Sequence, residues 1–341
     1  MRRAFKRLML FPVALAMLVQ PAFAWPPDGV VVAPVPDRGQ DEPHLLLGKH
    51  GAPFAYWSDG RWLDGSFDLY AQFLTSSGQV ALGWPDTGLM VARAFDDQRA
   101  VSGLSHPDGS FILGILDYRN SVVGGTDVDT YVARVLPDGS TDPTWPRHGF
   151  QATRRFGVEG ARRMIWVAPD TFVTCTGFTE PQGPFFPKFQ FQSVAITPSG
   201  PEALWGPEGL VYQWRPNPLL TTAEVAPDGT GGLFAVFDEY HSSLIVEDPP
   251  NADLYLMRLG RDGQPAAGWE TGAKPICVAP AIRNSPCAVP TGRAASSWPG
   301  SMHARVPDSP ILTSSTPRTS ACCGSPRRGP RTPGGRARDW W

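Results

Sequence analysis

Acidic and basic side chains recur at the ends of apolar stretches, and these are the residues whose types and spacing could support chemistry. The set comprises Trp57, Asp59, Arg61, Asp117, Arg119 and Asp238. Carboxylates beside guanidinium groups could form a ring that faces a ligand, or they could be an ion pair that caps a turn. Because the same arrangement recurs along the chain, and repeated residues usually serve the repeat itself, a structural corner is the favoured interpretation.

Motifs for catalysis or cofactor binding are absent from the sequence. The six His residues form no H-E-x-x-H motif, and the chain has no G-x-S-x-G elbow, no Gly-rich phosphate loop and no S-x-D-x-G-x-x-W box. Glu202, Glu208 and Glu224 could in principle pair as glycosidase carboxylates, but surface acids on an acidic domain are the favoured interpretation. Asp127-Val-Asp129 could offer oxygen ligands to Ca²⁺, although one D-x-D pair carries little specificity. We therefore expect no cofactor, with Ca²⁺ the one ion that the sequence hints at.

The first 24 residues have the pattern of a secretory signal. A basic start is followed by an apolar run, Leu8 to Val19, and by Ala22-Phe23-Ala24. This order predicts cleavage after Ala24 and a mature protein outside the cell or on its surface. The apolar run is shorter than the roughly 20 residues that span a bilayer, and no later stretch is long enough.

Composition and charge narrow the class of protein. The chain has 341 residues, of which 36 are Gly, 37 are Pro and 42% are hydrophobic, so it can build a core but not long helices. Residues 25–290 carry 18 basic and 30 acidic side chains, a net charge of −12, which argues against a nucleic-acid partner. The five Cys residues form no regular framework, and Cys175 is expected to be a buried apolar residue.

A repeat of about 60 residues organises the elements that carry these side chains. Its clearest marker is W-x-x-x-G, and the motif in the fifth unit is one residue shorter. The units start near Trp25, Trp84, Trp145, Trp205 and Trp269, at spacings of 59, 61, 60 and 64 residues.

Two further markers divide each unit. Asp68-Leu-Tyr70, Asp129-Thr-Tyr131 and Asp253-Leu-Tyr255 each open an alternating, strand-like run that ends at a turn Gly. In the third unit Gln192 replaces the Tyr, and that unit departs most from the pattern. Pro-Asp-Gly turns lead into apolar strands that end at the corners. Each unit is therefore predicted to hold three or four short strands.

Radial stacking of such units would bury a continuous core, with Trp and Tyr packing between units. The predicted fold is an all-β, β-propeller-like array of about four complete four-stranded units plus a broken fifth, within residues 25–290. The pattern resembles the repeats of secreted bacterial propeller-like proteins. Val135 to Trp145 is similar to the delta-60 propeller repeat in its D-G-S-x-D core. The resemblance covers residues 25–276 and implies a propeller, but no particular activity.

Residues 291–341 break the repeat. They carry eight Arg and two Asp in a Pro/Ser-rich segment, and they are predicted to be disordered. A reading-frame shift between about Cys277 and Pro290 would explain the change. Codons for Pro290 to Ala304, read in the shifted frame, can spell the missing turn, apolar strand and Trp-x-Asp-x-Arg corner. A native basic tail is the competing interpretation.

The sequence therefore predicts an exported, non-enzymatic repeat protein that binds or scaffolds at the cell surface or outside the cell. The expected partner is an extracellular protein or glycan, and we expect a monomer without a membrane span. A propeller-type glycan hydrolase is the alternative, and a truncated, non-functional product of a frameshifted gene is a third possibility.

Overall fold

The computed structural model describes residue 25 and residues 28–35, 39–62, 64–121, 127–179, 188–212, 219–240 and 252–277. All of them belong to the first of two units into which the chain divides, Met1–Ser301. The predicted signal peptide (1–24) and the predicted disordered tail (291–341) lie outside the described residues. Among the residues described, no helix combines the length and apolarity needed to cross a membrane.

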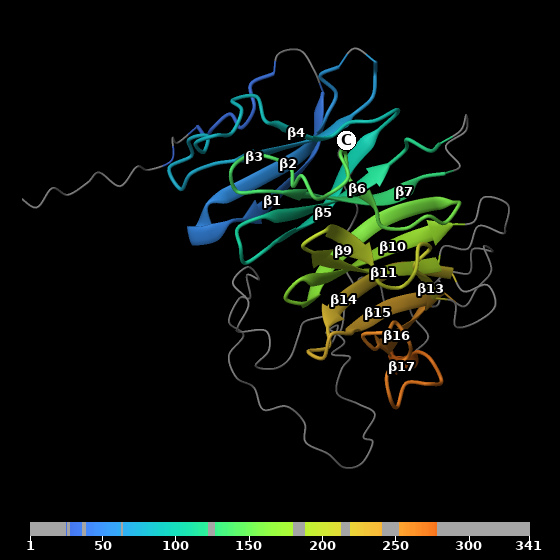
Figure 1. The fold of residues 1–341 in the computed structure, drawn as a ribbon. Coiled ribbons are helices and arrows are strands. Elements are labelled where there is room, and N and C mark those ends of the chain that lie inside the picture. The colour runs from blue at the N-terminus through green and yellow to red at the C-terminus, as the bar shows by residue number, and fades with distance from the viewer. Residues whose placement is uncertain are drawn as a thin grey trace, which may run out of the picture. The chain divides into compact units, whose positions relative to one another are not determined.

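In the described part of the chain four antiparallel sheets follow one another, and in each of them the strands pair in sequence order (Figure 1). The first sheet holds β1 (Gln40–Leu47), β2 (Pro53–Asp59), β3 (Asp68–Phe73) and β4 (Leu89–Ala92), with a short 3-10 turn at Lys49–Gly51 between β1 and β2. The second holds β5 (Gln98–Ser105), β6 (Phe111–Asp117), β7 (Asp129–Val135) and β8 (Phe150–Gln151). The fourth holds β14 (Leu219–Pro227), β15 (Leu233–Tyr240), β16 (Ala252–Leu259) and β17 (Lys274–Cys277).

The third sheet repeats this order with one addition. It contains β9 (Val158–Ala168), β10 (Thr171–Thr179), β11 (Lys188–Thr197) and β13 (Leu210–Tyr212), and an extra strand β12 (Gly200–Ala203) folds back on the end of β11. In place of the repeat Tyr, the buried Gln192 donates its amide to the carbonyls of Ala152 and Gly206. The most divergent unit therefore still forms the common four-stranded sheet.

These sheets confirm the predicted all-β fold of four complete four-stranded units, but they are offset from the units that the Trp residues mark. The strand after W-x-x-x-G closes a sheet instead of opening one, as β4 shows by pairing with β3 through Tyr70 and Met90. This strand forms its backbone hydrogen bonds with the D-x-Y strand that precedes it, and it therefore completes that sheet. The chain then crosses to a new sheet at Gln98.

Apolar clusters join successive sheets. One unites the first sheet with the second, another the second with the third, and another the third with the fourth. The strands β1, β5, β9 and β14, the first in their sheets, contact one another in that order. The buried residues Trp84, Trp145 and Trp205 lie in these clusters, as predicted for inter-unit packing. Cys175 is fully buried in the cluster between the third and fourth sheets, also as predicted.

Candidate binding face at the strand corners

The corner that ends β2 is closed around one buried carboxylate. Arg61 donates to both oxygens of Asp59 at 2.9 and 2.7 Å, and its backbone N–H donates to Oδ1. Trp57 Nε1 and Gln40 Nε2 add further hydrogen bonds to Oδ2 at 2.8 and 3.0 Å. Burial would raise the pKa of Asp59, but these donors together hold it below its usual value. The guanidinium also stacks on the Tyr70 ring at 3.7 Å.

The same corner recurs at the end of β6. Arg119 donates to both oxygens of Asp117 at 2.8 and 2.6 Å and stacks on Tyr131 at 4.0 Å. Asp238 is buried near the end of β15. Asp59 and Asp117 are thus brought to equivalent positions in separate sheets, and each forms an internal ion pair with its arginine. In the fourth sheet the prediction is off by one residue, because Glu239 lies opposite Asp253 and Asp238 lies opposite Leu254.

Each corner also faces a second carboxylate across the strand pair. Asp59 lies opposite Asp68, and Asp117 lies opposite Asp129. Asp129 accepts hydrogen bonds from Asn120 and Gln151 at 2.6 and 3.0 Å. Asp68 differs from Asp129, because neither of its buried oxygens accepts a hydrogen bond within the described part of the chain.

The carboxylate of Asp68, which accepts no hydrogen bond from the described residues, has a raised pKa. Arg93 Nε lies 3.6 Å from Oδ2, and this charge only partly offsets burial, which raises the pKa of Asp68 to about 7. Arg93 itself donates to Asp64 and stacks over Trp62 at 3.9 Å. An unsatisfied buried carboxyl beside aromatic and guanidinium groups makes this corner chemically distinct from its repeat.

Burial raises the pKa of Asp129 as well as that of Asp68. Glu159 is a further buried carboxyl with a raised pKa, and the repeat markers did not reveal it. It is the second residue of β9 and lies opposite Phe178, whereas Gln40 and Gln98 begin β1 and β5 and lie opposite Asp59 and Asp117. Its Oε2 accepts hydrogen bonds from the Thr130 N–H and the Thr153 hydroxyl. Burial raises the pKa of Glu159 to about 7. The signal available in the sequence was its position ten residues after Gly149, where Gln98 follows Gly88 at the same interval.

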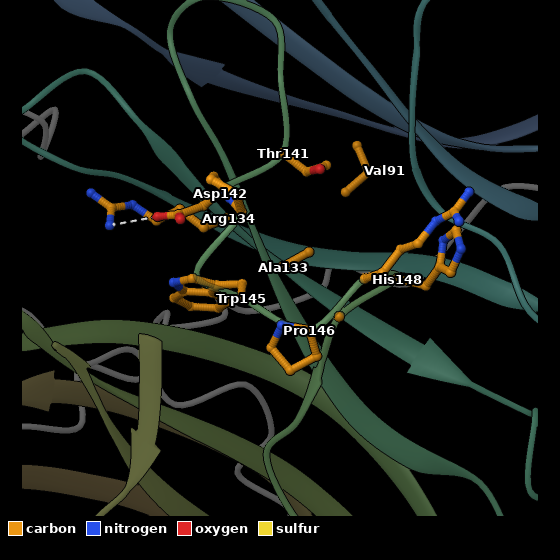
Figure 2. A pocket seen from close by; sticks show the side chains of 11 residues that line it. Val91, Ala133, Arg134, Thr141, Asp142, Trp145, Pro146 and His148 are labelled. Atoms are coloured by element: carbon orange, nitrogen blue, oxygen red, sulfur yellow. Dashed lines mark hydrogen bonds and ion pairs between the residues drawn. The ribbon is translucent and has the colours of Figure 1, made fainter. Parts of the chain in front are cut away.

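A pocket of about 300 Å³ lies beside the second corner, at the boundary between the first and second sheets. Figure 2 shows Trp145, Pro146 and His148 on its walls and the Arg134–Asp142 ion pair at one side. The His148 Nδ1 accepts a hydrogen bond from the Arg93 N–H. The His148 carbonyl accepts one from Arg119. His148 therefore links the pocket to both corners, although none of the predicted site residues lines it.

The corner ends of the sheets together form one face, here called the corner face. Among the described residues it comprises 60–62 and 64–67 after β2, 118–121 and 127–128 after β6, and the segments 93–97 and 152–157 that precede β5 and β9. Adjacent sheets are joined there, because the Phe67 N–H donates to Asp97 and the Val128 N–H donates to the Gly157 carbonyl. Exposed aromatic side chains stand on this face: Trp62, Phe95 and Phe156 are 41%, 76% and 58% exposed. Phe95 and Phe156 occupy matching positions before β5 and β9.

Both carboxylates of the D-x-D pair that could hold Ca²⁺ accept hydrogen bonds from the protein itself. Asp127 accepts a hydrogen bond from the Gly157 N–H, and Asp129 accepts its two amide donors. No group of three or more His, Cys, Asp or Glu side chains suited to a metal ion occurs among the residues that the structure describes.

The fold and its repeated corners define a β-propeller-like repeat protein. No protein-family model and no curated protein matches the chain. In structure it is similar to a protein of unknown function from Dyadobacter fermentans, with 13% identity over 69% of each chain and a TM-score of 0.45. An α-L-arabinanase from Penicillium chrysogenum has 10% identity over 72% of this chain and 70% of its own, with a TM-score of 0.43.

A thermostable family-43 glycoside hydrolase is also similar, with 14% identity over 72% of this chain and 77% of its own, and a TM-score of 0.35. At such identities and TM-scores, the substrates of these enzymes say nothing about the substrate of this chain. No residue role transfers from them to the corners described above.

Proposed function

We propose that this chain is an exported, non-enzymatic, β-propeller-like repeat protein that binds an extracellular protein or glycan through its corner face. The observation that carries the proposal is the group of exposed aromatic residues Trp62, Phe95 and Phe156 on that one face. Arginines and acids surround them, as in the stacking of Arg93 on Trp62. Aromatic platforms with a charged rim suit sugar rings and protein side chains alike.

The ion pairing and burial of the carboxylates support binding rather than hydrolysis. A glycosidase needs two carboxyl groups that reach the scissile bond, one of them with a raised pKa. The carboxylates of Asp59 and Asp117 form ion pairs with Arg61 and Arg119. Asp68 and Glu159 have raised pKa values, but their side chains are fully or almost fully buried, so a substrate could not approach within hydrogen-bond distance.

Export is proposed on the signal-like pattern of residues 1–24, and a monomer is proposed as the working form. The resemblance to secreted bacterial propeller-like repeats agrees with this placement. Both parts of the proposal can be tested by sequencing the N-terminus of the secreted protein and by measuring its mass in solution.

The decisive experiment measures binding and cleavage on the same samples. The mature chain is applied to a panel of purified polysaccharides, arabinan included, and to purified extracellular proteins, with dissociation constants measured for each. Trp62→Ala and Phe95→Ala should weaken binding at least about tenfold, the loss typical of a central aromatic contact. Leu82→Ala is the control, because Leu82 is fully exposed on the β3–β4 connection, at the other end of the first sheet.

Release of reducing sugar from any polysaccharide would contradict the proposal and favour the hydrolase. Equal loss of binding in Leu82→Ala and Trp62→Ala would also contradict it, because the corner face would then not be the binding surface.

A further inference from the structure

The pocket beside the second corner has room because one strand position carries a small side chain. Ala133 lies two residues after the repeat Tyr, opposite Leu113, and lines the pocket. The equivalent positions of the other three described sheets carry larger, buried side chains: Gln72, Val194 and Met257, opposite Ala55, Phe172 and Ala235. Gln72 donates to the Pro85 carbonyl at 2.7 Å and so occupies the corresponding place in the first sheet. Beside Ala133 a space of about 300 Å³ is left instead.

The pocket has an apolar lining. In the view of Figure 2, Val91 and Thr141 lie above the space, Trp145 and Pro146 lie below it, and His148 lies to its right. Val91 and Trp145 are buried, so their inner surfaces offer contacts to a bound group and not to bulk solvent. A volume of about 300 Å³ is at the lower end for small-molecule sites, and it suits a single ring.

The acidic side chain on the pocket wall is already paired. Asp142 accepts a hydrogen bond from Arg134 at 3.0 Å and two from the N–H and hydroxyl of Thr144 at 2.8 and 2.7 Å. Arg134 donates in addition to Ser110 and Asp108. The two opposite charges at this side of the pocket are therefore satisfied within the protein, and neither requires a ligand.

His148 contributes a hydrogen-bond donor to the pocket. Its Nδ1 accepts a hydrogen bond from the Arg93 N–H at 3.2 Å, which assigns the proton of the neutral ring to Nε2. Burial lowers the pKa of His148, and the charges of Arg147, Arg119 and Arg93 lower it further, so the ring is neutral near pH 7. Its backbone has φ +67°, an uncommon conformation for a residue other than Gly. The same arginines make this wall attractive to an anion.

Arg147 is a cation of the pocket that no acid neutralises within the described part of the chain. Its side chain is exposed and lines the pocket beside His148. The hydroxyl of Thr141 also lines the pocket and has no hydrogen-bond partner among the described residues. The polar side-chain groups left for a ligand are thus a guanidinium, an imidazole N–H and a hydroxyl. Such a set suits an anionic group, and a planar guanidinium suits a carboxylate in particular.

We propose that this pocket binds a small carboxylate, whose charged group is held by Arg147 and the Nε2–H of His148 and whose ring lies against Trp145 and Val91. One unpaired guanidinium and an apolar lining favour a singly charged compound with a compact apolar body over a phosphate. The pocket contains none of the exposed aromatic residues of the corner face, so the proposal is independent of which ligand that face binds.

The test measures binding of benzoate and D-glucuronate to the mature chain by titration calorimetry, with benzamide and D-glucose as the matched neutral compounds. At least one carboxylate should bind, and its neutral counterpart should bind at least about tenfold more weakly. Binding of benzoate alone would identify a planar apolar body, and binding of glucuronate alone would identify a sugar. Ala133→Met, which introduces the residue type of Met257, should abolish binding because it fills the space.

Arg147→Ala should weaken binding of the carboxylate at least about tenfold, and it changes only an exposed side chain. His148→Asn covers the case in which Ala133→Met fails to fold. Asn tolerates the left-handed backbone and can accept from the Arg93 N–H, but it lacks the Nε2–H, so binding should weaken. Arg261→Ala is the control, because Arg261 is an exposed arginine in the turn after β16 and does not line the pocket.

Three results would overturn the proposal. The first is that neither carboxylate binds the native chain at millimolar concentration. The second is that the neutral compounds bind as tightly as the carboxylates, because the pocket would then not select an anion. The third is an unchanged affinity in both Arg147→Ala and His148→Asn, because the carboxylate would then bind elsewhere.

Discussion

At the residue scale, the corners show how a carboxylate can be buried without becoming reactive. Asp59 is fully buried yet receives hydrogen bonds from Arg61, Trp57 and Gln40. A carboxylate saturated with donors has little tendency to take up a proton, so it does not suit general acid catalysis. The arginine is held in turn by its stacking on the D-x-Y tyrosine. The recurring Asp-x-Arg pattern is thus explained by the stability of each corner.

Replacing the arginine should reveal the cost of the buried charge. Arg119→Ala leaves Asp117, which is fully buried, without its bidentate partner. We expect a loss of about 3–5 kcal/mol in the free energy of unfolding, measured with urea. Arg119→Lys should fall between Arg119→Ala and the native protein, because lysine lacks the planar fork. Arg147→Ala, on the exposed turn after Trp145, should stay within about 0.5 kcal/mol. Equal stability of Arg119→Ala and Arg147→Ala would show that the corner pair is dispensable.

The buried carboxyl of Glu159 predicts a dependence of stability on pH. Its pKa is raised from 4.5 to about 7, so the folded protein holds this proton more tightly than the unfolded chain does. The resulting stabilisation is complete below pH 4.5 and is lost as the pH rises through about 7. Glu159→Gln, which introduces the residue type of Gln98, removes the titration. Between pH 5 and pH 8 the variant should lose less stability than the native protein, by on the order of 1 kcal/mol.

Unfolding curves at several pH values test this sign. Asp68→Asn should act in the same direction, because burial also raises the pKa of Asp68. A steeper loss of stability at high pH in Glu159→Gln than in the native protein would contradict the assignment.

At the element scale, the first sheet is joined to the second, and the third to the fourth, by contact between a repeat Trp and the tight turn of the following sheet. Gly139 has φ +84° in the turn after β7, and a Cβ there would lie 3.1 Å from the Gly83 carbonyl and 3.2 Å from the Trp84 ring. The turn glycine therefore provides both a left-handed backbone and room for the neighbouring Trp. These two requirements explain why D-G and W-x-x-x-G recur in a fixed relation.

Two glycine substitutions separate these requirements. Gly206 has φ +78°, and a Cβ at this position would meet open space within 4 Å, so Gly206→Ala should cost only the strain of the left-handed backbone. That strain amounts to about 1–2 kcal/mol. Gly139→Ala should cost more, because the new methyl group also displaces the Trp84 ring. Thermal unfolding of both variants measures the difference. Equal melting temperatures would mean that the Trp84 contact adds nothing to the turn.

At the scale of the whole molecule, the net charge divides by region. The described sheets lie in the acidic middle, and the eight arginines of residues 291–341 lie outside the described residues. The frameshift prediction concerns this boundary. The coding DNA around codons 277–290 should contain a single-base insertion or deletion, after which the shifted frame continues the repeat. A DNA sequence whose shifted frame does not encode a turn, an apolar strand and a corner would refute the frameshift prediction.

The sequence by itself determined the all-β class, the repeat, the burial of Trp84, Trp145 and Trp205, and the positions of the first two corners. These features follow from local rules: turn residues, alternating apolar positions and fixed spacings are visible in one dimension. Only the tertiary structure decided which strands share a sheet, because the strand after W-x-x-x-G pairs with the D-x-Y strand that precedes it in the chain.

The tertiary structure also decided which acids are satisfied. Asp68 and Asp129 occupy the same place in their repeats, yet only Asp129 has Asn120 and Gln151 within reach. Glu159 is isolated in the sequence and meets Thr130 and Thr153 only after β7 and β9 come together. Such pairings depend on contacts between distant segments, and burial fixes their electrostatics. A single sequence therefore marks where the corners lie, while the fold sets the protonation and exposure of each group.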